Sequence, residues 1–279
     1  MINLPAPAQS ALETYTACIS RVQDPILRQR LVDATQAVVD ASREFAQAAA
    51  GKRLHRIAQH THVAEVVTRE EMEAVYTQRM ARKGAPGRPI YDALLSSAPQ
   101  GKCPLCVHRN VSTLDHHLPK AHYPSLAVAP LNLIPACPEC NKSKLAAVPT
   151  AAEEAPLHPY FDEIDQDRWL HATVIEEEPA ALRFFVQGPP TWGAVLTARV
   201  ERHFRALRLG ALYATEAADE LLSIRHQLHD INARGGPALV RQELVDRAES
   251  CRAARRNGWR TATFDAFAAS DWFCGGGFS

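Results

Sequence analysis

Two Cys-x-x-Cys pairs constrain this sequence more than any other feature. The pairs are Cys103 with Cys106 and Cys137 with Cys140, and a proline follows the first cysteine of each. Two tight turns of this kind supply the four thiolates that a tetrahedral zinc ion prefers, so the spacing predicts a structural zinc site. The alternative is four incidental buried thiols. The 30 residues between Cys106 and Cys137 exceed the usual zinc-ribbon spacing, which predicts a further element mounted between the turns.

The segment between the cysteine pairs carries a cluster of polar residues. It reads STLDHHLPKAHYP over 112–124 and then NLIPACPECNKSK over 132–144. Loss of helical periodicity predicts a short strand that enters a loop at Asp115 and His116, and a helix that begins near Asn141. Neutral histidine can accept a proton near pH 7, and carboxylate and amide oxygens suit a hard divalent cation.

The order Asp-His, Asn, Asn, set around two Cys-x-x-Cys turns with the last Asn directly after the second, resembles the HNH family of His-Me-finger nucleases, which have a ββα-metal fold. The resemblance covers about residues 101–146. It implies that His116 is the general base and that Asp115 and Asn141 bind a catalytic Mg²⁺ or Mn²⁺. It also implies that Asn132 braces the loop that orients His116.

Other residues of this segment have two interpretations each. His117 follows the expected base on the opposite face of the strand, where it contacts either substrate or metal, or else packs in the core. Three lysines are candidate phosphate contacts, with solvated surface lysines as the alternative: Lys120, Lys142 and Lys144. Outside this segment, four arginines could provide further phosphate contacts, or could line a solvated helix face: Arg252, Arg255, Arg256 and Arg260.

The flanking sequence predicts a mainly α fold with a small α+β insert. Helical periodicity dominates 1–98, the zinc-framed HNH module occupies 99–148, and 149–279 holds a β-hairpin near 169–187 followed by helices. Thr68, with acids after it and bases before Gly84, predicts a capped helix over 68–84. The segments around the motif also resemble, more loosely, phage-defence HNH nucleases such as the Septu nuclease subunit, some of which act beside an ATPase.

Charge and composition bear on the partners. The net charge is zero, yet residues 99–150 carry five basic and two acidic side chains, which suits a small anion-binding site on a neutral scaffold. No apolar run is long enough to cross a bilayer and no signal peptide is evident, so we expect a cytoplasmic protein without a membrane partner. Residues 151–279 carry 14 basic and 19 acidic side chains, which favours protein docking there over DNA binding.

The sequence therefore predicts a metal-dependent HNH endonuclease that cuts DNA, with a role in antiviral defence and a regulatory partner such as an ATPase or another defence-system subunit. Its cofactors are a structural zinc and a catalytic magnesium or manganese. The alternative is a zinc-ribbon module that binds nucleic acid or protein without cleavage. A guided or site-specific enzyme would need a base-reading domain, which is not evident.

Overall fold

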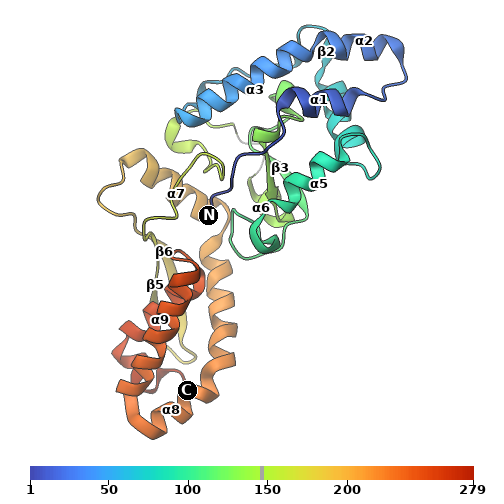
Figure 1. Ribbon diagram of the computed structural model, residues 1–279. Helices are drawn as coiled ribbons and strands as arrows, with labels where there is room; N and C mark the ends of the chain where they lie inside the picture. The colour runs from blue at the N-terminus through green and yellow to red at the C-terminus, as the bar shows by residue number, and fades with distance from the viewer. Residues whose placement is uncertain (145–147) are drawn as a thin grey trace. The chain divides into compact units, whose positions relative to one another are not determined.

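Helices account for most of the chain in the computed structural model, which describes residues 1–144 and 148–279 (Figure 1). The mainly α prediction is confirmed at that level. The chain divides into two units, Met1–Glu163 and Ile164–Ser279. The boundaries predicted from the sequence at 98/99 and 148/149 both lie within the first unit. In the described part of the chain, no helix is both long and apolar enough to span a membrane.

The first unit surrounds a two-stranded hairpin with helices. Its α-helices are α1 (Ala11–Ile19), α2 (Pro25–Asp33), α3 (Thr35–Ala50), α4 (Arg69–Ala74), α5 (Arg88–Ser96) and α6 (Pro138–Lys144), and a π-helix, η2 (Val75–Ala81), continues α4. Its strands are β1 (His62–Val63), β2 (Val67–Thr68), β3 (Thr113–His116) and β4 (Leu133–Ala136). Short 3₁₀ turns are η1 (Leu54–Arg56), η3 (Pro99–Gly101), η4 (Pro124–Leu126), η5 (Pro130–Asn132) and η6 (Ala152–Glu154).

The capped helix predicted at Thr68 is present, but it changes type. Thr68 Oγ1 accepts from the backbone N of Glu71 (3.3 Å), and the Glu71 carboxylate accepts from the backbone N of Thr68 (2.9 Å). This reciprocal capping box satisfies two amides that a helix start would leave unpaired. From Val75 onward the chain forms the π-helix, which the sequence periodicity did not distinguish from an α-helix.

The hairpin β3–β4 is anchored in the main core of the first unit. The strands pair antiparallel, with His116 opposite Leu133 and Thr113 opposite Ala136. Leu114 and Leu133 are buried in the same apolar cluster as side chains from α1, α3, α4, η2 and α5. Helix α5 packs along the hairpin and α6 follows β4 directly (Figure 1). The core therefore fixes the segment that the sequence analysis singled out.

The second unit is a hairpin packed on helices. It contains β5 (Leu170–Ile175), β6 (Ala181–Val186), α7 (Ala194–Ala206), α8 (Leu209–Ala254), α9 (Trp259–Ala269) and the π-helix η7 (Phe273–Gly277). The hairpin predicted near 169–187 is confirmed by the pairing of β5 with β6. Within α8, Gly236 takes φ +66° and turns the chain, so α8 is two antiparallel helices, as Gln227 contacts Arg247 (2.6 Å) across the turn.

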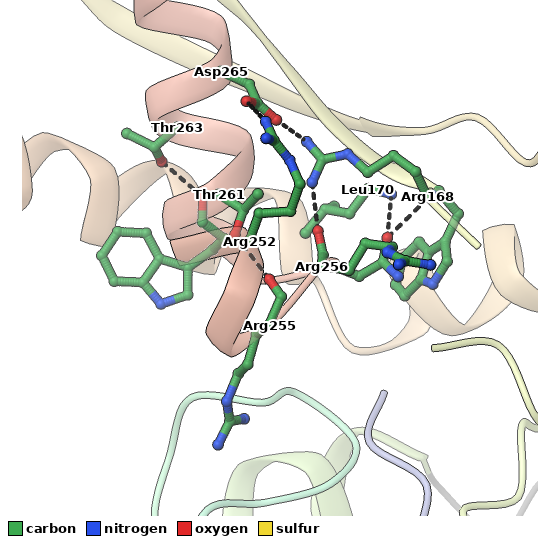
Figure 2. A network of polar contacts seen from close by, with 11 residues as sticks. Arg168, Leu170, Arg252, Arg255, Arg256, Thr261, Thr263 and Asp265 are labelled. Atoms are coloured by element: carbon green, nitrogen blue, oxygen red, sulfur yellow. Dashed lines mark hydrogen bonds and ion pairs between the residues drawn. The ribbon is translucent and has the colours of Figure 1, made fainter. Parts of the chain in front are cut away.

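Polar contacts tie the chain before β5 to the junction of α8 and α9. Figure 2 shows Arg168 and Arg252 donating together to the carboxylate of Asp265, at 2.7 and 2.5 Å. Asn257 accepts from the backbone N of Trp169 (2.8 Å) and Leu170 (3.2 Å) and donates to a carbonyl of the same segment. These bonds satisfy backbone groups just before β5 and at its first residue.

Candidate functional site

The four cysteines of the two pairs form one buried cluster that can hold a metal ion. The Sγ atoms of Cys103, Cys106, Cys137 and Cys140 all lie within 4.8 Å of one another, and Cys106 is 4.0 Å from Cys137. A tetrahedral zinc ion with Zn–S bonds of about 2.3 Å separates its sulfurs by about 3.8 Å. The donor set and its spacing therefore fit zinc.

The turns around the cysteines aim backbone amides at the sulfurs. The backbone N of Arg109 donates to Cys106 Sγ and that of Cys140 donates to Cys137 Sγ, both at 3.4 Å. Val107, directly after the first pair, has φ +58°, a left-handed conformation that a β-branched residue rarely adopts. The turn that follows Cys103 and Cys106 is therefore maintained although the backbone of Val107 is strained.

Contact among the sulfurs and burial favour the neutral thiol of Cys140 over its thiolate. Hydrogen bonding of the Cys140 thiol to the neighbouring sulfurs, first among them Cys103, raises its pKa, and burial raises it further. A divalent cation stabilises the thiolates that this contact and burial disfavour. At this level the fold and site define a mainly helical protein with a buried cluster of four cysteines that can hold a metal ion.

A loop of 16 residues, 117–132, joins β3 to β4 and is braced by Asn132. The Asn132 side chain is fully buried. Its Oδ1 accepts from the backbone N of Leu118 (2.7 Å), and its Nδ2 donates to the carbonyls of Leu118 (3.0 Å) and Leu126 (3.2 Å). One side chain therefore connects the start of this loop to its middle.

The same loop orients His116 at the end of β3. Nε2 of His116 lies 2.8 Å from the carbonyl oxygen of Ala127. Because a carbonyl can only accept, this bond places the proton of the neutral ring on Nε2, and Nδ1 carries the lone pair. The ring of Tyr76 lies against the imidazole, with centroids 4.4 Å apart and planes at 71°. His116 is therefore held in one tautomer beside an aromatic wall.

Asp115, His116 and Asn141 line one open cleft of about 410 Å³. Asp115 is 6% exposed, and Asn141 donates from Nδ2 to Thr113 Oγ1 (3.3 Å), which leaves its Oδ1 as the side-chain ligand atom. A carboxylate and an amide oxygen in one cleft are hard donors that suit Mg²⁺ or Mn²⁺. The other lining residues are Tyr76, Thr113, Leu114, Pro119, Lys120 and Ala121.

His117 points away from this cleft into the core. It is buried, and the centroid of its ring lies 4.2 Å from that of the His158 ring and 6.3 Å from that of the Phe45 ring. His116 at the end of β3 and His117 directly after it thus have different surroundings, as strand alternation predicts. Of the two interpretations of His117, packing in the core is the one that matches its position in the structure.

The predicted phosphate contacts have different surroundings. Lys120 lines the cleft and pairs with Glu73, at 3.4 Å. Lys142 is exposed on α6, whereas the side chain of Lys144 lies outside the described residues. In the second unit Arg252 pairs with Asp265 and Arg260 with Glu220 (2.8 Å). Arg256 donates to the carbonyl of Gln166, and Arg255 is half-buried. Arg252, Arg256 and Arg260 are thus exposed side chains that also make intramolecular contacts, and their role as a phosphate track stays a prediction.

Two groups at the site were not predicted from the sequence. Tyr76 is one of several apolar or aromatic residues in a helical segment, and nothing local distinguishes it. The carbonyl of Ala127 is a backbone group, so its residue type carries no signal. Both reach His116 only through the tertiary fold.

Comparison with known proteins finds similarity to Protein ea31 of Escherichia phage lambda. The two are 28% identical over 234 residues, which cover 80% of this chain and 79% of that protein. No family model matches the chain, and no solved structure matches it. The name of the phage protein states no activity, so the chemistry of the site has to be argued from its residues.

Proposed function

We propose that this protein is a metal-dependent endonuclease of the HNH type that hydrolyses phosphodiester bonds in DNA. The observation that carries the proposal is the meeting of Asp115, His116 and Asn141 in one cleft, beside a four-cysteine cluster that can hold zinc. The hairpin β3–β4 followed by α6 has the element order expected of a ββα-metal module. Neither the similarity to the phage protein nor the four-cysteine cluster assigns this activity, so the proposal rests on the residues of the cleft.

His116 has the arrangement that a general base needs. With Nε2 donating to Ala127, Nδ1 accepts a proton from the water that attacks phosphorus. The new P–O bond forms as the bond to the leaving deoxyribose oxygen breaks, and that oxygen takes up a proton from solvent. Mg²⁺ or Mn²⁺, when bound by Asp115 and Asn141, supplies neutralisation of charge on the phosphate oxygens. Asn132 keeps the Ala127 carbonyl in place by bracing its loop.

Basic side chains near the cleft suit binding of a polyanion such as DNA, although the net charge of the whole chain is zero. Lys120 at the cleft and Lys142 on α6 offer charge-assisted contacts to phosphates, which position a strand without reading its bases. Glu73 competes for Lys120, so binding of a phosphate there exchanges one ion pair for another. We therefore expect cleavage with little sequence preference and a marked dependence on salt.

The direct test is incubation of the purified protein with supercoiled plasmid and Mg²⁺ or Mn²⁺. We expect nicking in the wild type and none in His116→Ala, while His122→Ala, a half-buried histidine in the same loop, keeps most of the activity. Zinc content is measured in each protein, because a chelator that removes Mg²⁺ also removes zinc. A zinc-loaded, folded wild type that binds plasmid without nicking it would favour the module that binds without cleaving.

The proposal extends to a setting in antiviral defence with a regulatory partner, because an unrestrained DNase damages its own cell. The excess of acidic side chains over 151–279 suits docking of a protein. We expect a tagged chain to retain the product of an adjacent gene in a pull-down, and that product to change the nicking rate. Absence of any stable complex counts against the partner and leaves the nuclease proposal untouched.

A further inference from the structure

We infer that Tyr76 is a positioning residue that holds the imidazole of His116 in its reactive orientation. The inference rests on the proposed function for its catalytic consequence. Its structural part is that the Tyr76 ring stands edge to face with the imidazole, at a centroid distance of 4.4 Å and an angle of 71°. Tyr76 also lines the cleft that holds Asp115 and Asn141.

The chain places Tyr76 firmly against β3. Tyr76 is the second residue of the π-helix η2, and it is buried beside Val75 and Met80 in the main core. Its hydroxyl donates to the carbonyl of Leu114 over 3.4 Å, a long and therefore weak bond. The ring consequently has little freedom to move, and it contacts both the strand and the imidazole at the end of that strand.

Tyr76 acts as a neutral wall rather than as a base. Burial first, and then the neighbouring Tyr91 and Asp115, raise the pKa of Tyr76 above its ordinary value. An ordinary tyrosine already stays protonated where an imidazole titrates, so the Tyr76 hydroxyl stays neutral there as well. Because its hydroxyl already faces the Leu114 carbonyl, the ring is the part that His116 uses.

Two contacts together fix the imidazole. The Ala127 carbonyl holds Nε2, and the Tyr76 ring blocks rotation of the imidazole out of that hydrogen bond. An aromatic pair of this geometry favours one arrangement by about 2- to 12-fold. Without the ring, a larger share of His116 would leave the Ala127 carbonyl, and Nδ1 would face the attacking water less often.

The test compares Tyr76→Phe and Tyr76→Leu with a matched control, Tyr160→Leu. Tyr160 is a half-buried tyrosine whose hydroxyl donates to the carbonyl of Leu133 (3.0 Å), the residue opposite His116 on β4. It braces the same hairpin but from β4. The measurements are kcat and KM on a labelled duplex, together with the ¹⁵N chemical shifts of the His116 ring near neutral pH.

We expect Tyr76→Phe to keep kcat within about 2-fold and Tyr76→Leu to lower it by about 10-fold with little change in KM. In Tyr76→Leu the two His116 nitrogens also move from shifts of an Nε2–H tautomer toward an average of both tautomers. Tyr160→Leu changes neither readout. Wild-type kcat and unchanged nitrogen shifts in Tyr76→Leu would overturn the inference. If the wild type does not cleave DNA at all, the nitrogen shifts still decide whether Tyr76 holds the ring.

Discussion

Replacing Asn132 with alanine tests how the loop of the candidate site is held. The change removes three buried hydrogen bonds, one from the Leu118 amide and two to the carbonyls of Leu118 and Leu126. At about 1 kcal/mol each they contribute about 3 kcal/mol, and a buried amide left unpaired adds about 1 kcal/mol. We therefore expect Asn132→Ala to lower the free energy of unfolding of the first unit by about 4 kcal/mol.

Asn257 provides a matched control in the second unit. It also makes three hydrogen bonds to backbone groups around the start of β5, accepting from the Trp169 and Leu170 amides and donating to the Asp167 carbonyl. Asn257→Ala is therefore expected to cost a similar free energy of unfolding, but in the second unit. The Asn257→Ala change leaves the loop with the Ala127 carbonyl, which accepts from His116, unchanged. We therefore expect the Asn257→Ala variant to keep its cleavage activity under native conditions.

The distribution of tryptophan separates the two units in one urea titration. All four tryptophans, Trp169, Trp192, Trp259 and Trp272, belong to the second unit, whereas the cysteine cluster belongs to the first. Tryptophan fluorescence thus follows the second unit, and zinc release into a chromogenic chelator follows the first. Asn132→Ala is expected to move the zinc-release midpoint alone. A loss below about 1 kcal/mol, or an equal shift of both transitions, would refute the reasoning.

Three further predictions concern the first unit. Cys140→Ser removes one zinc ligand, so bound zinc falls well below one per chain by elemental analysis, and the zinc-dependent part of the stability is lost. Val107→Gly relieves the strain of a valine in the left-handed conformation, which is about 1–2 kcal/mol, but it costs about 0.5–1 kcal/mol because glycine loses more conformational entropy on folding. The urea midpoint is therefore expected to rise slightly, and a clear fall would contradict the strain argument. The hydrogen bond from Arg30 holds the pKa of Glu71 below its usual value of about 4.3, so its stabilisation is present above that pH and is lost as the pH falls through the lowered pKa. Glu71→Gln is therefore less stable than the wild type at neutral pH, and the gap closes below about pH 4; a constant gap would contradict this linkage.

Features that depend on neighbouring residues were predictable from the sequence. The capping box of Thr68 and Glu71 lies within four residues, and the alternation over 170–186 lies within two short strands, so neighbouring residues alone predict each structure. The two Cys-x-x-Cys pairs likewise predicted that their four sulfurs gather in one cluster that can hold a metal ion, because the spacing of each pair is set by the turn that it makes. These are the levels at which the sequence analysis agrees with the structure.

Features that depend on distant residues were not predictable. The contact between Tyr76 and His116 joins residues 40 positions apart, and no local pattern marks the tyrosine. A π-helix of seven residues has nearly the same apolar pattern as an α-helix, so the widened turn at Val75–Ala81 left no sequence signal. Lys120 was predicted as a phosphate contact, and its pairing with Glu73 appears only in the fold.

The pairing register of β3 with β4 limits how this sequence can change in length. Each strand has four residues, and Thr113–His116 runs opposite Leu133–Ala136 without a bulge. A single inserted or deleted residue inside either strand would turn every later side chain of that strand to the opposite face, and such a change in β3 would turn the histidine at position 116 away from the cleft. Alignments of more distant relatives are therefore expected to be free of gaps in both strands, with changes of length confined to the segments outside them.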